Sequence, residues 1–217
     1  LEFLRERLRG FEQVVPEDVE LPRFIGGAVG LVGYDWVRFV ERLPHANPDT
    51  LDLPDVAFVF PEIVIVYDNV RHTALLVRHA RIEPGSDPKQ AYQAAVDEIQ
   101  RMVDTLRQPM PAAPGWEPSA VPMDVEYGMS REDYLAIVER AKEYIRAGEI
   151  FQVVLSRSLS LPLQAEPFEI YRELRRVDPS PYLMFVRSGG AILIGASPEI
   201  LVRLEGSRVD VRPIAGT

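Results

Sequence analysis

The side chains that could carry out chemistry are few in this sequence. It contains no cysteine, which excludes disulfides, thiolate zinc sites, iron–sulfur clusters and cysteine nucleophiles. Its three histidines are His45, His72 and His79, and none has the spacing typical of metal ligands on a helix. Since a phosphate-binding glycine loop is also missing from the sequence, the residues alone predict an α+β protein without an assigned reaction.

Composition narrows the class of protein. The chain has 217 residues with a formal charge of -9, and 47% of its residues are hydrophobic. Such an acidic chain is a poor ligand for a phosphate backbone, so a nucleic-acid partner is disfavoured. No apolar run approaches the about 20 residues of a membrane-spanning helix. Because the sequence begins at Leu1 and stops at Thr217 within an expected strand, we expect it to be a piece of a longer polypeptide.

The first half combines helices with an antiparallel sheet. Gly27, Gly30 and Gly33 fall three residues apart and predict that another backbone approaches them closely. Between residues 89 and 107, apolar residues recur at helical spacing, which predicts a long amphipathic helix that covers one face of the sheet. The expected elements are a short helix before Gly10, strands at 56–60, 63–67 and 73–78, and this helix at 89–107.

Five prolines between Pro109 and Pro122 predict a linker at 109–127, separating a region at 1–108 from one at 128–217. After it, Ser130 begins a capping box and Gly148 ends the helix. The second half is predicted to be α+β with a meandering sheet. Its further elements are a strand at 150–155, a helix at 167–176 and strands at 182–186, 191–196, 200–204 and 208–212.

Four short segments in a fixed order resemble motifs of the chorismate-utilising enzymes, and among these the anthranilate synthase component I family. They are Ala147-Gly-Glu-Ile-Phe-Gln-Val-Val-Leu-Ser-Arg157, Asp178-Pro-Ser-Pro-Tyr182, Gly195-Ala-Ser-Pro-Glu199 and Arg212-Pro-Ile-Ala-Gly-Thr217. The glycine-rich block at 24–35 resembles the same family's N-terminal region. The resemblance implies a partial α+β fold of mostly antiparallel sheet layers covered by helices, with 128–217 as the first part of the chorismate-binding domain.

The resemblance also implies an activity for the full-length parent. That activity is a Mg²⁺-dependent lyase reaction of tryptophan biosynthesis in the cytoplasm, in which chorismate and ammonia give anthranilate and pyruvate. The ammonia comes from glutamine through a glutamine amidotransferase subunit, component II. The family's catalytic residues and Mg²⁺ ligands lie beyond residue 217, so we expect no catalytic or metal residue in this chain and no activity from it alone.

Two positions bear on the branch of the family. Gln152 stands where isochorismate-forming members tend to carry a lysine base, and a neutral amide cannot accept a proton. Ala215 stands where aminodeoxychorismate synthases typically carry lysine. Both residues favour anthranilate synthase. Aminodeoxychorismate synthase component I of the folate branch and a non-catalytic tryptophan-binding regulatory module remain the alternatives.

By resemblance, Gly216 and Thr217 contact chorismate, because glycine allows close backbone approach and threonine offers a hydroxyl and an N–H. Pro181, Tyr182 and Leu183 are expected to bind tryptophan as feedback inhibitor, with the aromatic ring as a wall for the indole.

Asp178 and Leu183 replace the asparagine and methionine that most relatives have at these positions. We interpret Glu199 as a structural acid that orders its turn. The strand at 208–214 is expected to lack a partner and to recruit other chains.

Overall fold

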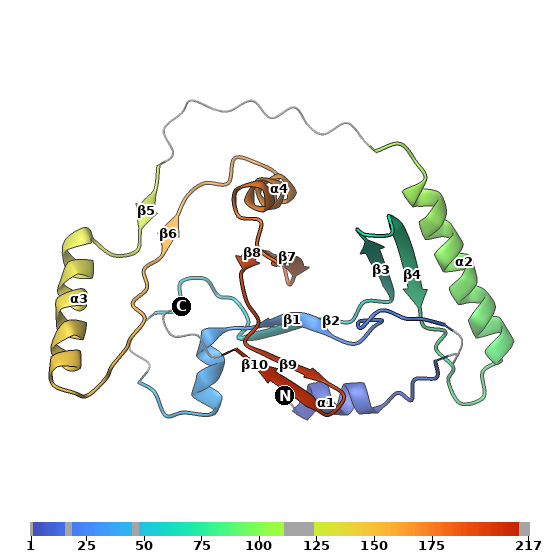
Figure 1. Ribbon diagram of the computed structural model, residues 1–217, viewed down its shortest axis with the longest axis horizontal. Coiled ribbons are helices and arrows are strands. Elements are labelled where there is room, and N and C mark those ends of the chain that lie inside the picture. The colour runs from blue at the N-terminus through green and yellow to red at the C-terminus, as the bar shows by residue number, and fades with distance from the viewer. Residues whose placement is uncertain (1, 16–18, 45–47, 111–123, 213–217) are drawn as a thin grey trace. The chain divides into compact units, whose positions relative to one another are not determined.

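The computed structural model describes residues 2–15, 19–44, 48–110 and 124–212, which belong to two compact units, Leu1–Ala113 and Pro114–Thr217 (Figure 1). The described elements of the first unit are α1 (Glu2–Arg9), β1 (Val29–Val32), the 3-10 helix η1 (Tyr34–Phe39), β2 (Val56–Val59), β3 (Ile63–Asp68), β4 (Thr73–Arg78) and α2 (Pro88–Leu106). Those of the second are β5 (Glu126–Tyr127), α3 (Arg131–Arg146), β6 (Leu159–Ser160), α4 (Pro167–Val177), β7 (Tyr182–Ser188), β8 (Ala191–Ser197), β9 (Val202–Glu205) and β10 (Arg208–Val211).

The strands of the described ranges pair two by two, and every pair is antiparallel: β1 with β2, β3 with β4, β5 with β6, β7 with β8 and β9 with β10. This confirms an α+β fold with antiparallel sheets. The predicted meander is wrong, because β8 and β9 are not paired. Pro198 follows β8 directly and has no N–H to donate, and the chain turns there before β9 begins.

Two further predictions about strands are also wrong. The segment at 150–155 is not in any sheet, because a strand needs a hydrogen-bonded neighbour as well as β-branched residues, and none of the described strands pairs with it. The strand at 208–214 was expected to be unpaired, yet Arg208–Val211 pairs with β9, because the two-residue turn Gly206–Ser207 brings the strands together.

The long helices begin and end where local chemistry dictates. The Asp87 carboxylate accepts a hydrogen bond from the Lys89 N–H at 3.0 Å at the start of α2, and Pro88 occupies its first turn. The Ser130 hydroxyl accepts from the Asp133 N–H at 3.0 Å at the start of α3. Gly148, with φ of 78°, follows its end, as a left-handed residue does. Ala95 of α2 and Ala141 of α3 are the buried apolar side chains of the described residues.

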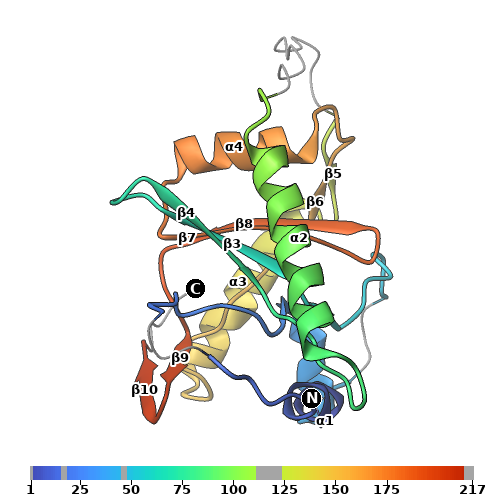
Figure 2. The same cartoon turned by 90° about the vertical axis from the view of Figure 1, so that its right-hand side faces the viewer.

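In the first unit, α2 packs against the β3–β4 hairpin, as predicted (Figures 1 and 2). The contact includes an ion pair of 2.5 Å between Arg78 of β4 and Glu98 of α2. The glycine prediction holds in part. A Cβ on Gly30 would overlap the Ala57 carbonyl oxygen, and one on Gly33 would lie 3.3 Å from the Asp55 oxygen, whereas Gly27 approaches a side chain only.

In the second unit, α4 packs on the β7–β8 hairpin. Phe168 and Tyr171 of α4 meet Phe185 of β7, with ring centroids 5.4 and 5.8 Å apart in edge-on arrangements. Phe168 and Tyr171 therefore face the hairpin from the helix predicted at 167–176. Residues 178–181, which contain the proline-rich motif, connect the end of α4 to the start of β7.

Candidate functional site

The β7–β8 hairpin brings two of the four motifs together. The Gly189–Gly190 turn sets a register in which Tyr182 lies opposite Ser197 and Leu183 opposite Ala196. Pro181, the first of the predicted tryptophan-binding residues, is exposed just before β7, and Tyr182 and Leu183 are half-buried. Tyr182 and Leu183 and the motif residues 195–197 therefore form one end of a single hairpin, and Pro181 directly precedes it.

An arginine that the sequence analysis did not single out holds the predicted site. The Arg203 guanidinium of β9 donates a hydrogen bond of 2.9 Å to the Tyr182 hydroxyl, and this contact is partly buried. The same guanidinium lies 3.9 Å from the Glu205 carboxylate. Arg203 thus joins the β9–β10 hairpin to the β7–β8 hairpin. Arg203 and Tyr182 are 21 residues apart in the chain and share no periodic pattern, so nothing in the sequence indicated this contact.

The proline-rich turn before β7 is ordered by its own polar groups. The Asp178 N–H donates to the Leu174 carbonyl at 2.8 Å, which closes the end of α4. The Ser180 hydroxyl donates to the Asp178 carboxylate at 2.6 Å. An asparagine could also accept this bond, so the aspartate keeps the turn and adds a negative charge beside the predicted inhibitor site.

The turn after β8 differs from the prediction. The Ser197 hydroxyl donates to the Glu199 carbonyl at 3.0 Å, and the Glu199 N–H lies 3.5 Å from the same hydroxyl. The hydroxyl of Ser197 and the main chain of Glu199 therefore order the turn, in place of the Glu199 carboxylate that was predicted to do so. A serine two residues before a turn is a known local motif, so this signal was present in the sequence.

The predicted substrate residues Gly216 and Thr217, together with Ala215, lie outside the described residues. Gln152 is described and exposed, and it lies in the segment at 150–155 that is not in any sheet. The structure therefore describes the predicted tryptophan-binding residues Pro181, Tyr182 and Leu183 but not the predicted chorismate-binding residues.

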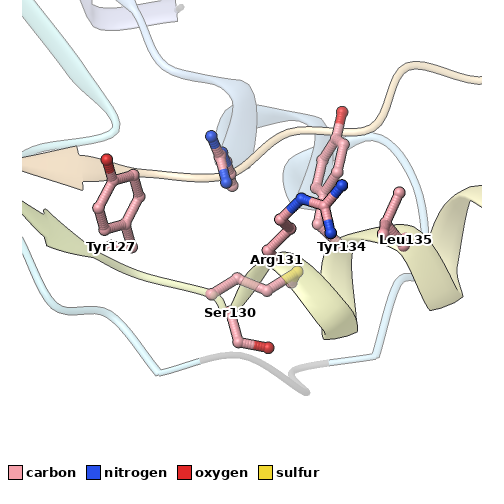
Figure 3. A pocket seen from close by; sticks show the side chains of 7 residues that line it. Tyr127, Ser130, Arg131, Tyr134 and Leu135 are labelled. Atoms are coloured by element: carbon pink, nitrogen blue, oxygen red, sulfur yellow. The ribbon is translucent and has the colours of Figure 1, made fainter.

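A pocket of about 580 Å³ lies beside the start of α3 (Figure 3). The Arg157 guanidinium lies between two tyrosine rings, 5.3 Å from the centroid of Tyr127 and 5.5 Å from that of Tyr134. The lining of the pocket offers positive charge and aromatic faces, which can bind a ligand. It includes no carboxylate or imidazole that could act as a general base. The lining residues are Tyr127, Met129, Ser130, Arg131, Tyr134, Leu135 and Arg157.

Carboxyl groups with a lowered pKa include Glu98 and Asp68 of the first unit and Glu139 of α3. Arg78 donates a hydrogen bond to Glu98 and lowers the pKa of that carboxyl. The N–H groups of Arg71 and Val70 lower the pKa of Asp68 in the β3–β4 turn. Within the described ranges, no three acidic or histidine side chains gather to hold a metal ion.

The sequence and fold match known proteins over most of the chain. A family model described as chorismate binding enzyme matches residues 2–217. The chain is 48% identical over 198 residues to the anthranilate synthase component 1 of Thermus thermophilus, a match of 91% of this chain and 41% of that protein. It is 41% identical over 217 residues to that of Cereibacter sphaeroides, a match of 100% of this chain and 43% of that protein.

A solved structure agrees with these matches. The crystal structure of anthranilate synthase component I from Streptococcus pneumoniae matches with a TM-score of 0.79 and 30% identity, over 96% of this chain and 45% of that one. The chain thus spans about two-fifths of the length of these relatives. No helix among the described residues is long and apolar enough to cross a membrane.

Proposed function

We propose, since this chain belongs to the chorismate binding enzymes, that it forms part of an anthranilate synthase component 1. One observation carries the proposal: curated relatives at 48% and 41% identity both bear that name. The names favour the tryptophan branch over aminodeoxychorismate synthase. Gln152 and Ala215 support the same choice, because neither side chain can act as a base or carry positive charge.

The reaction proposed for the complete protein is a substitution followed by an elimination. Ammonia adds to the chorismate ring as the ring hydroxyl leaves as water, and pyruvate is then eliminated to leave anthranilate. In this proposal a glutamine amidotransferase subunit supplies the ammonia in the cytoplasm, and Mg²⁺ binds the substrate through residues that the resemblance places beyond residue 217. The chain by itself is then inactive.

Within this proposal, the end of the β7–β8 hairpin is the feedback site for tryptophan. Pro181 fixes the rim, and Tyr182 and Leu183 offer an aromatic and an aliphatic wall. The hydrogen bond from Arg203 fixes the Tyr182 ring, which reduces the entropy that the ring loses when an indole packs on it. Gly216 and Thr217 remain the proposed contacts to chorismate, and 1–108 and 128–217 the proposed domains on either side of the linker.

A chimeric enzyme tests this function. In it, the chain replaces the matching part of the Thermus thermophilus relative, and anthranilate is followed by its fluorescence with chorismate, ammonia and Mg²⁺. We expect anthranilate from the chimera and none from the chain alone. A folded chimera that consumes chorismate to aminodeoxychorismate, or an active chain without the remaining part, would overturn the proposal.

The same chimera tests the tryptophan site. Tyr182→Ala should weaken inhibition by tryptophan by about tenfold or more, because the aromatic wall of the site is lost, while the uninhibited rate stays the same. Arg187→Ala on the same strand is the matched control and should leave inhibition unchanged, since Arg187 is exposed and lies five residues along β7. Equal inhibition of the Tyr182→Ala variant and the unsubstituted chimera would place tryptophan elsewhere.

A further inference from the structure

Three segments of the second unit converge on the pocket beside the start of α3. β5 pairs with β6, and the Gly128 N–H donates a hydrogen bond of 3.0 Å to the Ser158 carbonyl. A Cβ on Gly128 would overlap the Ser158 hydroxyl, so glycine permits this close approach. The pairing carries Arg157 to the Tyr127 ring, and the first turn of α3 supplies the second ring, that of Tyr134 (Figure 3).

The two rings hold the Arg157 guanidinium without using its hydrogen-bond donors on an acidic partner. Its Cζ lies 5.3 and 5.5 Å from the two ring centroids, within the range of cation–π attraction. Among the described residues, no carboxylate lies within ion-pair distance of Arg157, and no oxygen accepts a hydrogen bond from its side chain. A guanidinium that aromatic contacts orient in this way can present two N–H groups to a carboxylate.

A second guanidinium lines the same pocket. Arg131 occupies the first turn of α3, and within the described ranges its side chain forms neither an ion pair nor a hydrogen bond. The helix dipole opposes a cation at this end of a helix, so a bound anion would relieve the repulsion. Glu132 and Asp133 share this turn but do not line the pocket, and the Asp133 carboxylate accepts a hydrogen bond of 2.7 Å from the Ser130 hydroxyl. The positive charge of the two arginines therefore faces the pocket without a carboxylate in its lining.

The remaining lining selects the body of the ligand. Met129 and Leu135 add apolar side chains to the two tyrosine rings around a volume of about 580 Å³. The chain as a whole carries a formal charge of -9, so an anion must be held here by local donors against the long-range field. Inorganic phosphate would satisfy the charge but leave the apolar lining in water, whereas a hydrocarbon ring would cover it. The lining thus favours an organic acid over an inorganic anion.

We propose that this pocket binds a small organic dicarboxylate with a flat apolar body. One carboxylate pairs with Arg131 and the other with Arg157, and the body lies against Met129 and Leu135. The site binds its ligand without a covalent step. This inference goes beyond the proposed function and does not depend on it, since none of the lining residues is among those predicted to bind chorismate or tryptophan.

Isothermal titration of the 217-residue chain with isophthalate, an aromatic dicarboxylate, tests the site. We expect a Kd of about 1 mM or tighter at low salt, which is a typical affinity for a ligand of this size. Benzoate, with one carboxylate, should bind at least about fivefold more weakly, because it can pair with only one guanidinium. Benzamide has no charge and inorganic phosphate has no apolar body, so both should bind more weakly still. The affinity for isophthalate should fall as the salt concentration rises.

Three variants identify the pocket as the place of binding. Arg157→Gln and Arg131→Gln should each weaken isophthalate binding at least about fivefold, because each removes one guanidinium. The matched control is Arg175→Gln, which removes the same charge from an arginine that also lies over a tyrosine ring, 5.8 Å from the centroid of Tyr171, but does not line the pocket. It should change the Kd by less than about twofold.

The Arg131→Gln variant also separates binding from folding. Removal of a cation from the start of α3 should leave the circular dichroism of the chain unchanged or stabilise the helix, since the helix dipole no longer opposes it. Loss of binding in a variant that keeps its helix content then reports on the site itself.

No binding of isophthalate, equal affinities for isophthalate and benzamide, or equal losses in Arg157→Gln and Arg175→Gln would overturn the proposal. A peptide with two adjacent glutamates that binds at least as tightly as isophthalate would assign the pocket to an acidic protein segment, and would also overturn it. None of these outcomes bears on anthranilate production by the chimera, so the failure of this proposal and that of the proposed function are distinguishable.

Discussion

Arg203 and Tyr182 should stabilise the β7–β8 hairpin jointly, and a double-mutant cycle can measure that coupling. Tyr182→Phe removes the hydroxyl that accepts the 2.9 Å hydrogen bond, and Arg203→Met keeps the length of the side chain but removes its donors. A hydrogen bond with a charged partner is worth about 1.5–3 kcal/mol when buried. Because the Arg203 side chain is 33% exposed, we expect a coupling of about 0.5–1.5 kcal/mol, near that of an ordinary hydrogen bond.

Amide hydrogen exchange followed by mass spectrometry is a suitable assay, since it reports local opening of β7 and β8. A coupling of this size corresponds to a roughly two- to tenfold change in the opening constant beyond the sum of the single variants. The cycle also cancels the loss of the Arg203 contact with Glu205, which occurs with and without the tyrosine hydroxyl. Combining Tyr182→Phe with Arg187→Met, on the same strand, gives a control that should be additive. Additive effects for Arg203→Met and Tyr182→Phe would refute the argument that this bond positions the tyrosine.

Two further predictions concern the first unit. Gly30→Ala should destabilise the β1–β2 pair by about 1–3 kcal/mol, because its Cβ would overlap the Ala57 carbonyl oxygen and lie 2.8 Å from the Phe58 Cα, and these backbone atoms cannot rotate away. The control is Gly10→Ala, whose Cβ would meet no atom closer than 3.6 Å and which should be neutral or stabilising by up to about 1 kcal/mol. Equal hydrogen-exchange rates of β1 and β2 in both variants would contradict this prediction. In the folded protein the pKa of Glu98 lies below its ordinary value of 4.5. Between the lowered pKa and 4.5 the unfolded state therefore binds more protons than the folded state. The contact with Arg78 thus stabilises the unit fully above about pH 4.5, and this stabilisation is lost as the pH falls through the lowered pKa. Glu98→Gln should therefore flatten the acid dependence of exchange in α2 and β4, and an unchanged profile would show that Arg78 does not set it.

Local signals in the sequence were sufficient for most helices and strands. Ser130 and Gly148 delimit α3 because a cap and a left-handed glycine act on adjacent backbone groups. The hairpins β3–β4 and β7–β8 follow from β-branched runs and turn residues that are close in the chain. These features depend on neighbours within a few residues, so the order of residues specifies them directly.

The strand predicted at 150–155 shows where such reasoning fails. Its residues favour an extended backbone, but a strand exists only when another strand supplies hydrogen-bond partners, and a preference for extended backbone does not identify that partner. The same reason explains why β8 and β9 are not paired, although the run of short strands predicted a single sheet.

The sequence by itself determined the family, through four ordered motifs, and it placed Pro181 and Tyr182 in one of them and Leu183 directly after it. Only the tertiary structure revealed that Arg203 holds Tyr182 and that Arg157 lies between two tyrosine rings. The physical reason is the range of the interactions. Motifs and caps act between residues near in the chain, whereas these contacts depend on which distant segments the fold brings together.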